Sequence, residues 1–154
     1  MTKLKIGDLA PQFKANDQNG KTINLTDYKG KKVVIYFYPK DDTPGCTAEA
    51  CNLRDNYEAL LNKGYIIIGV SADSEQSHKK FISKYNLPFP LISDLNKEVL
   101  NAYGVWGEKK NYGKTYEGIF RTTFVISGTG RIENIIEKVD TSNHTQQILE
   151  LHKN

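Results

Sequence analysis

Two stretches of the chain are continuously apolar and rich in residues that favour strands. They are Val33–Tyr38 and Tyr65–Ser71, and each has the length of a strand that is buried on both faces of a sheet. Between them, apolar residues recur with the 3.6-residue period of a helix that packs on the sheet, at Ala50, Leu53, Tyr57 and Leu60, before Gly64 ends the pattern. This order predicts a βαβ unit in which the two strands run parallel.

The rest of the chain continues to alternate between helices and strands. We expect helices and strands, in chain order, at Ser74–Tyr85 (helix), Phe89–Ile92 (strand), Asn96–Tyr103 (helix), Thr122–Ile126 and Arg131–Val139 (strands) and Ser142–Leu151 (helix). The turn Ser127–Gly130 joins the last two strands as a hairpin, and Asn16–Lys21 has the character of a second hairpin turn near the N-terminus. The pattern predicts an α/β fold with a thioredoxin-like, central mixed β-sheet flanked by helices and an N-terminal hairpin extension.

Length and composition narrow the class of protein. The chain has 154 residues, of which 38% are hydrophobic and 25% charged, so we expect one globular domain over residues 1–154. The apolar runs are too short to span a membrane, and Met1–Asp8 lacks the apolar stretch of a signal peptide, so we expect a cytoplasmic protein. The net charge of +3 comes from scattered basic residues, a pattern that argues against nucleic-acid binding.

The most informative segment is the turn that follows the first apolar strand. Thr43 and Pro44 have the character of an N-cap and a first helical residue, so Cys46 is expected in the first turn of a helix. The free N–H groups and the dipole of a helix N-terminus stabilise an anion there, which favours the thiolate form of Cys46 and makes it a nucleophile. The alternative is an inert cysteine that serves as a small buried hydrophobe.

A second cysteine, Cys51, follows five residues later in the same predicted helix. A structural zinc site needs two more ligands, and the three histidines, His78, His144 and His152, have no spacing that supplies them. A thioredoxin-type dithiol needs the spacing Cys-x-x-Cys. Five residues along an intact helix separate two Cα atoms by about 8.7 Å, beyond the roughly 7 Å limit of a disulfide. A bond between these cysteines therefore requires the helix to unwind.

Several segments in this order resemble the peroxiredoxin family. Pro39, Thr43 and Cys46 fit its Pro-x-x-x-Thr/Ser-x-x-Cys motif, and the Cys-x4-Cys pair resembles the Q-type, or bacterioferritin comigratory protein, subfamily. Further matching segments are Gly7–Phe13, Tyr103–Lys109, Thr115–Ile119 and Arg121–Phe124, so the resemblance extends over almost the whole chain.

The resemblance implies a role for each matching residue. Cys46 corresponds to the cysteine that attacks the peroxide and becomes a sulfenic acid. Arg121 and Thr43 correspond to the groups that stabilise the peroxide oxygens, Glu49 to the acid that orients the arginine, and Pro39 to a residue that shields the site from water. Three of these residues also have a simpler interpretation: Arg121 as a surface residue at a strand start, Thr43 as a helix cap, and Glu49 as an acid on the helix surface.

Cys51 corresponds to the resolving cysteine of those relatives that carry one in this helix. The resemblance implies an intramolecular disulfide with Cys46 that thioredoxin or a similar dithiol reduces. It implies no haem, flavin or metal cofactor, and an intramolecular disulfide removes the chemical need for a dimer, so we expect a monomer. The remaining loop residues Lys40, Asp41, Asp42 and Trp106 are interpreted as packing residues with minor effects on access.

The sequence therefore predicts a thioredoxin-dependent peroxidase that reduces hydrogen peroxide and organic hydroperoxides and serves antioxidant defence. Two alternatives from other classes stay open. A protein disulfide oxidoreductase reduces protein disulfides without peroxide, and a redox sensor binds a partner in one redox state without useful turnover.

Overall fold

The computed structural model describes residues 2–152 and is built around the first apolar stretch, which forms strand β3 (Lys32–Phe37) at the centre of a five-stranded sheet. The sheet has the order β5-β4-β3-β8-β9, with β4 at Tyr65–Ser71, β5 at Leu91–Ser93, β8 at Thr122–Ile126 and β9 at Ile132–Ile136. Strands β3, β4 and β5 are parallel, whereas β8 is antiparallel to both β3 and β9. The βαβ unit, the mixed sheet and its antiparallel late part are confirmed.

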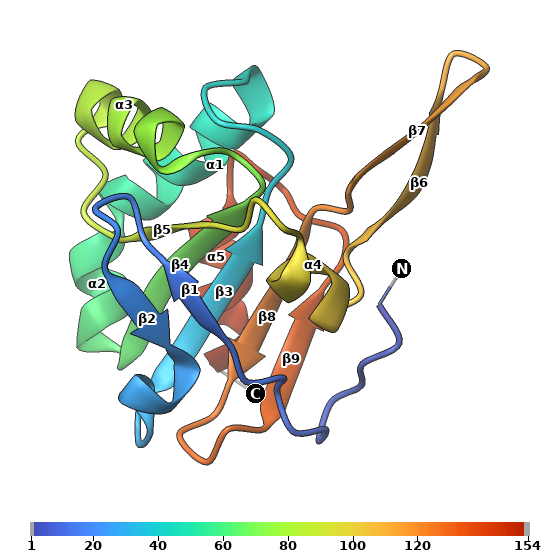
Figure 1. Cartoon of the computed structure of the whole chain (residues 1–154). Coiled ribbons are helices and arrows are strands. Elements are labelled where there is room, and N and C mark those ends of the chain that lie inside the picture. The colour runs from blue at the N-terminus through green and yellow to red at the C-terminus, as the bar shows by residue number, and fades with distance from the viewer. Residues whose placement is uncertain (1, 153–154) are drawn as a thin grey trace.

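Apolar residues lie on both faces of this sheet because successive side chains of a strand point to opposite sides. Val33, Ile35 and Phe37 of β3 belong to one core cluster, and Val34 and Tyr36 belong to the other. Helices α1 (Pro44–Asp55), α2 (Tyr57–Asn62), α3 (Glu75–Tyr85) and α5 (His144–His152) contribute to the second cluster, and α4 (Glu98–Ala102) contributes to the first. Figure 1 shows these elements around the sheet.

The long helix expected after β3 is interrupted, so its prediction as one element was wrong. The backbone leaves the helical region at Asn56, with φ −115° and ψ 14°, which separates α1 from α2. The Asn56 side chain donates a hydrogen bond from Nδ2 to the carbonyl of Asn52 at 2.8 Å and stabilises this break. Gly64, with φ +88°, follows the end of α2 as predicted.

Smaller differences concern the ends of elements. Strand β9 and helix α4 are shorter than the ranges expected from the sequence, and β5 lies one to two residues later. The N-terminal hairpin is present as β1 (Lys14–Asn16) and β2 (Thr22–Asn24), followed by a short 3-10 helix at Leu25–Tyr28. Within residues 2–152, no helix is long and apolar enough to cross a bilayer.

One hairpin was absent from the sequence prediction. Strands β6 (Trp106–Asn111) and β7 (Lys114–Ile119) pair with each other and form a sheet of their own. Figure 1 shows that this hairpin projects away from the main sheet. Its two-residue turn, Tyr112 and Gly113, has φ angles of 52° and 76°, the left-handed conformation that suits the twist of a tight hairpin.

Candidate active site

Cys46 lies in the first turn of α1, where the chain has just left the central strand. Thr43 occupies the N-cap position, with its carbonyl accepting the first helical hydrogen bond from the Thr47 N–H at 2.8 Å, and Pro44 is the first helical residue. The Cys46 side chain is a free thiol that is only 1% exposed and packs in the core cluster that contains Tyr36. The predicted position of Cys46 at a helix N-terminus is confirmed.

The tertiary structure brings Arg121 to this cysteine from the segment just before β8. Its Nη2 donates a hydrogen bond to the Cys46 sulfur at 3.4 Å, and its Nη1 donates to Oε1 of Glu49 at 2.7 Å. Gly45 leaves room for this contact, because a Cβ at that position would lie 3.2 Å from Nη2. The guanidinium therefore joins the thiol to a carboxylate one turn further along α1.

Burial acts strongly on the two charged groups of this pair. The Glu49 side chain is fully buried, and this burial raises its pKa to about 7 although Arg121 acts in the opposite direction. Burial lowers the pKa of Arg121, but the charges of Glu49 and Cys46 outweigh it, so that this pKa is raised overall. Arg121 therefore stays cationic beside the sulfur and stabilises negative charge there.

Thr43 and Pro39 lie in the segment that leads to Cys46. The Thr43 side chain does not cap the helix, which corrects that part of its interpretation; its hydroxyl donates instead to the carbonyl of Lys40 at 2.8 Å. Pro39 is half-buried between β3 and α1. The structure thus brings Arg121 and Glu49 into hydrogen-bonding distance of the site, whereas the catalytic roles of Thr43 and Pro39 stay predictions.

Cys51 lies in the same uninterrupted helix as Cys46. It is a free, half-buried thiol, in contrast to the buried Cys46. The next residue, Asn52, anchors this half of α1 to the segment around the start of α5: its side chain donates to the carbonyl of Ser142 at 2.9 Å and accepts from the Thr145 N–H at 2.8 Å. With α1 continuous over both cysteines, a disulfide between them requires local unwinding.

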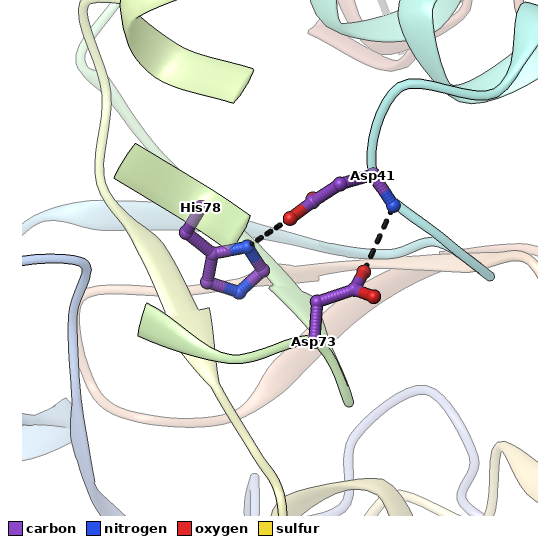
Figure 2. A group of neighbouring side chains, drawn as sticks. All are labelled: Asp41, Asp73 and His78. Atoms are coloured by element: carbon purple, nitrogen blue, oxygen red, sulfur yellow. Dashed lines mark hydrogen bonds and ion pairs between the residues drawn. The ribbon is translucent and has the colours of Figure 1, made fainter. Parts of the chain in front are cut away.

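A buried polar cluster around Asp41 supports the loop before Cys46. Asp41 is only 8% exposed, and its Oδ2 lies 2.7 Å from Nδ1 of His78 on α3. Its backbone N–H donates to Oδ2 of Asp73 at 2.8 Å, as Figure 2 shows. The hydroxyls of Tyr38 and Ser77 donate to the two carboxylate oxygens of Asp41 at 2.6 and 2.7 Å.

The same three residues, Asp41, Asp73 and His78, form the single group within residues 2–152 whose ligand atoms lie close enough together to hold a metal ion. Their facing atoms are already used in hydrogen bonds within the protein, and His78 Nε2 lies 2.9 Å from the carbonyl of Ile92. We therefore assign this cluster the structural role of fixing the loop. Sequence reasoning missed it because Asp41 and His78 lie 37 residues apart.

A second buried histidine, His144 at the start of α5, was also missed. It is fully buried, and its Nε2 lies 3.6 Å from Oε2 of Glu49 and 2.8 Å from the Thr123 hydroxyl. The sequence analysis considered His144 only as a zinc ligand and rejected that role. Its position next to Glu49 depends on how α5 packs against α1.

Comparisons with known proteins show the family of the chain. Residues 6–135 match the model of the AhpC/TSA family. The peroxiredoxin Bcp of Escherichia coli strain K12 is 46% identical over 149 residues, which cover 97% of this chain and 96% of that protein. The peroxiredoxin Bcp of Bacillus subtilis strain 168 is also 46% identical, over 150 residues that cover 97% of this chain and 96% of that one.

Solved structures show the same fold. The bacterioferritin comigratory protein of Xanthomonas campestris superposes with a TM-score of 0.90 at 35% identity, covering 99% of this chain and 98% of that one. A mutant of Xylella fastidiosa PrxQ superposes with a TM-score of 0.92 at 31% identity, with the same coverage. These findings confirm the resemblance and the thioredoxin-like fold predicted from the sequence. The chain therefore belongs to the AhpC/TSA family and, within it, to the Bcp or Q-type peroxiredoxins, which are thiol-dependent peroxidases.

Proposed function

We propose that Cys46 is the peroxidatic cysteine of this peroxidase. The contact of the Arg121 guanidinium with the Cys46 sulfur, at 3.4 Å and inside the protein, carries this assignment. The thiolate attacks the terminal oxygen of a hydroperoxide, the O–O bond breaks, and Cys46 becomes a sulfenic acid while an alkoxide or hydroxide leaves and takes up a proton. Negative charge moves from sulfur to the leaving oxygen in this step, and a fixed cation beside both atoms lowers the barrier.

The other residues of the site have supporting roles in this proposal. Glu49 holds the Arg121 fork through the 2.7 Å hydrogen bond to Nη1, which leaves Nη2 directed at the sulfur. Thr43 offers its hydroxyl to the peroxide from the turn before the helix, and Pro39 excludes water at the end of the strand. The family resemblance supports these two roles, together with the position of both residues in the segment between β3 and α1.

Cys51 resolves the sulfenic acid in our proposal. Its thiolate attacks the sulfenic sulfur, the S–O bond breaks as the disulfide with Cys46 forms, and the hydroxide that leaves takes up a proton to become water. A dithiol reductant then reopens the disulfide; we propose thioredoxin, in the cytoplasm, where the thiol pool is kept reduced. Because both cysteines belong to one chain, the cycle is complete in a monomer.

Hydrogen peroxide and organic hydroperoxides are the proposed substrates. The bacterioferritin comigratory protein of Xanthomonas campestris has alkyl peroxide reduction activity. We extend that substrate class to this chain on the strength of the shared fold and of a cation placed at the attacking sulfur.

The direct test compares wild type with Cys46→Ser in an assay that follows consumption of reduced thioredoxin. We expect wild type to consume it only when peroxide is present, and Cys46→Ser to be inactive. Reduction of insulin without peroxide would identify a disulfide oxidoreductase instead. Tight binding of a partner in one redox state, without turnover, would identify a sensor.

Cys51→Ser tests the resolving step. This variant should react once with peroxide and then stop, because no second thiol attacks the sulfenic acid. Intact-mass spectrometry is expected to show one added oxygen, and a second one as further peroxide produces sulfinic acid. Normal thioredoxin-dependent turnover of Cys51→Ser would mean that Cys51 is not the resolving residue.

Unwinding of α1 on oxidation has its own measurement. Formation of the disulfide should break backbone hydrogen bonds between Cys46 and Cys51, each worth about 1 kcal/mol net. Hydrogen exchange of residues 47–54 should be faster in the disulfide form than in the reduced form. Equal protection in both forms would point to an intermolecular disulfide.

A further inference from the structure

Glu49 uses only one of its two carboxylate oxygens. Oε1 accepts the hydrogen bond from Arg121, but Oε2 is enclosed and has no hydrogen-bond partner among the described residues. The hydroxyl of Tyr36, whose pKa is raised by burial and by the charge of Glu49, is enclosed without a partner as well. A buried polar oxygen without a partner is costly, so Oε2 is the unexplained atom of this site.

Nε2 of His144 lies 3.6 Å from Oε2, and the groups around His144 define the tautomer of its ring. The Asp140 N–H donates to Oε1 of Gln147 at 2.9 Å, and Nε2 of Gln147 donates to the Lys138 carbonyl at 3.0 Å, which orients the amide. The amide oxygen therefore faces Nδ1 of His144 at 2.8 Å, and Nδ1 must carry the proton. In the neutral ring, Nε2 is then an acceptor and binds the Thr123 hydroxyl at 2.8 Å.

An acceptor nitrogen thus faces an acceptor oxygen. Nε2 of His144 and Oε2 of Glu49 are 3.6 Å apart, both side chains are fully buried, and neither atom supplies a proton to the other. One added proton removes this conflict, because either atom then donates to the other after a small closing movement. The gap between the two atoms has the chemistry of a proton-binding site.

We propose that Glu49 and His144 form a buried pair that binds one proton between Oε2 and Nε2, and that its occupancy is coupled to the charge on Cys46. His144 is in this view a positioning residue, which acts on the sulfur through Glu49 and Arg121. The inference rests on the proposed role of Cys46 in catalysis.

The charges around the pair give the coupling its sign. Cys46 and Glu49 on α1 face the Arg121 cation, Tyr36 faces them from β3, and the negative charge of Asp140 acts on His144. A Cys46 thiolate and a Glu49 carboxylate together exceed the single positive charge of Arg121, so formation of the thiolate favours binding of a proton by the pair. Conversion of the thiolate to a neutral sulfenic acid removes that negative charge, and the pair releases its proton.

This exchange matches the needs of the reaction. The thiol loses a proton before the attack, and the leaving alkoxide gains one after it. Burial lowers the pKa of His144 and raises that of Glu49 to about 7, so the bound proton lies on the carboxyl group. Its donation to Nε2 requires the Thr123 hydroxyl to turn away, because that hydroxyl otherwise occupies the single lone pair of Nε2. The number of protons is the same before and after the step.

The titration of Glu49 itself tests the coupling without any peroxide. Carbon-13 NMR of protein labelled at the glutamate carboxyl carbons follows Glu49, assigned with Glu49→Gln, in reduced wild type and in Cys46→Ser. We expect the Glu49 midpoint to lie lower by about one pH unit in Cys46→Ser, because the thiolate is absent. Identical midpoints in the two proteins would overturn the coupling.

A second pair of variants tests His144. The amide of His144→Gln donates permanently to Oε2, so the Glu49 midpoint should fall by more than about one pH unit. Thr123→Val is the matched control: it removes the hydroxyl at Nε2 but keeps both titrating groups, and its midpoint should stay within about half a unit of wild type. An unchanged midpoint in His144→Gln would overturn the shared site.

The two proposals fail separately in these experiments. If His144→Gln does not fold, the comparison of wild type with Cys46→Ser still tests the coupling, because it leaves the Glu49–His144 pair intact. A coupled Glu49 titration in a protein that consumes no peroxide would contradict the proposed function and leave the proton site standing.

Discussion

Two buried acid–histidine pairs flank Cys46 in this structure, and they differ in one respect. Asp41 precedes the cysteine and faces His78, and Glu49 follows it and faces His144. Both oxygens of Asp41 have partners within hydrogen-bond distance, whereas Oε2 of Glu49 has none within the part of the chain that the structure describes.

The difference shows how a buried acid–histidine pair can have two different roles. The hydrogen bonds to both oxygens of Asp41 make that pair a rigid support for the loop. A buried polar network stabilises the fold most when every polar atom in it has a hydrogen-bond partner. The pair at Glu49 lacks one hydrogen bond, and one proton restores it. The incomplete pair is the one connected to the sulfur through Arg121.

The largest expected effect is on stability at the complete pair. Asp41→Ala removes the partner of two buried groups, on Tyr38 and His78, and of the half-buried Ser77 hydroxyl, and should lower the free energy of unfolding by about 3–5 kcal/mol. Asp41→Asn is the control, because an amide of the same shape still accepts from Tyr38 and still lies within hydrogen-bond distance of His78; it should lower the free energy of unfolding by about 1 kcal/mol. Urea denaturation measures both, and a loss below about 1 kcal/mol for Asp41→Ala would remove the structural role.

The incomplete pair predicts a pH dependence of stability. Burial raises the pKa of Glu49 from 4.5 to about 7. Below the lower value the carboxyl is protonated whether the chain is folded or unfolded, and it has no effect. Between the two values the folded protein holds a proton that the unfolded chain has lost, so the free energy of unfolding falls as the pH rises.

Above pH 7 the ionisation of buried Glu49 lowers the free energy of unfolding by its full amount of about 3 kcal/mol, since one pKa unit corresponds to about 1.4 kcal/mol. Glu49→Gln has no such ionisation. Its free energy of unfolding relative to that of wild type should therefore increase by about 3 kcal/mol between pH 4.5 and 8. Denaturation of both proteins at four or five pH values isolates this difference. A constant difference across the range would contradict the raised pKa.

Arg121→Lys separates charge from geometry at the sulfur. A lysine ammonium carries the charge, but it cannot bind Cys46 and Glu49 with two arms of one planar group. We expect the rate of peroxide reduction to fall by more than about 100-fold, which corresponds to about 2.7 kcal/mol. Stopped-flow measurement decides, and Arg131→Lys, at an exposed arginine bound to the Gly7 carbonyl, is the matched control. A rate within about threefold of wild type would exclude Arg121 from the site.

The smallest expected effect is at Gly45. A methyl group there lies 3.2 Å from Nη2 of Arg121, so the guanidinium must shift by a few tenths of an ångström. We expect Gly45→Ala to slow peroxide reduction by about threefold to tenfold, while alanine stabilises the helix by up to about 1 kcal/mol. A slower but equally or more stable protein fits this explanation, and an unchanged rate contradicts it.

Much of the fold was predictable from local patterns. The continuous apolar runs identified β3 and β4 because a strand buried on both faces needs apolar residues at every position. Thr43 and Pro44 identified the start of α1 through backbone chemistry that is local to the turn. The hairpin of β6 and β7 left no such pattern, because most of its side chains are exposed and nothing requires them to alternate.

The sequence by itself determined that a cysteine lies at a helix N-terminus after a buried strand, that Cys51 cannot reach it within an intact helix, and, through the family motifs, that Arg121 and Glu49 belong to the same site. Only the tertiary structure decided which polar groups surround these residues. Asp41 meets His78 across 37 residues, and Arg121 meets Cys46 across 75. Such contacts depend on how helices pack on the two faces of the sheet, and neither periodicity nor residue type specifies which buried oxygen is left without a partner.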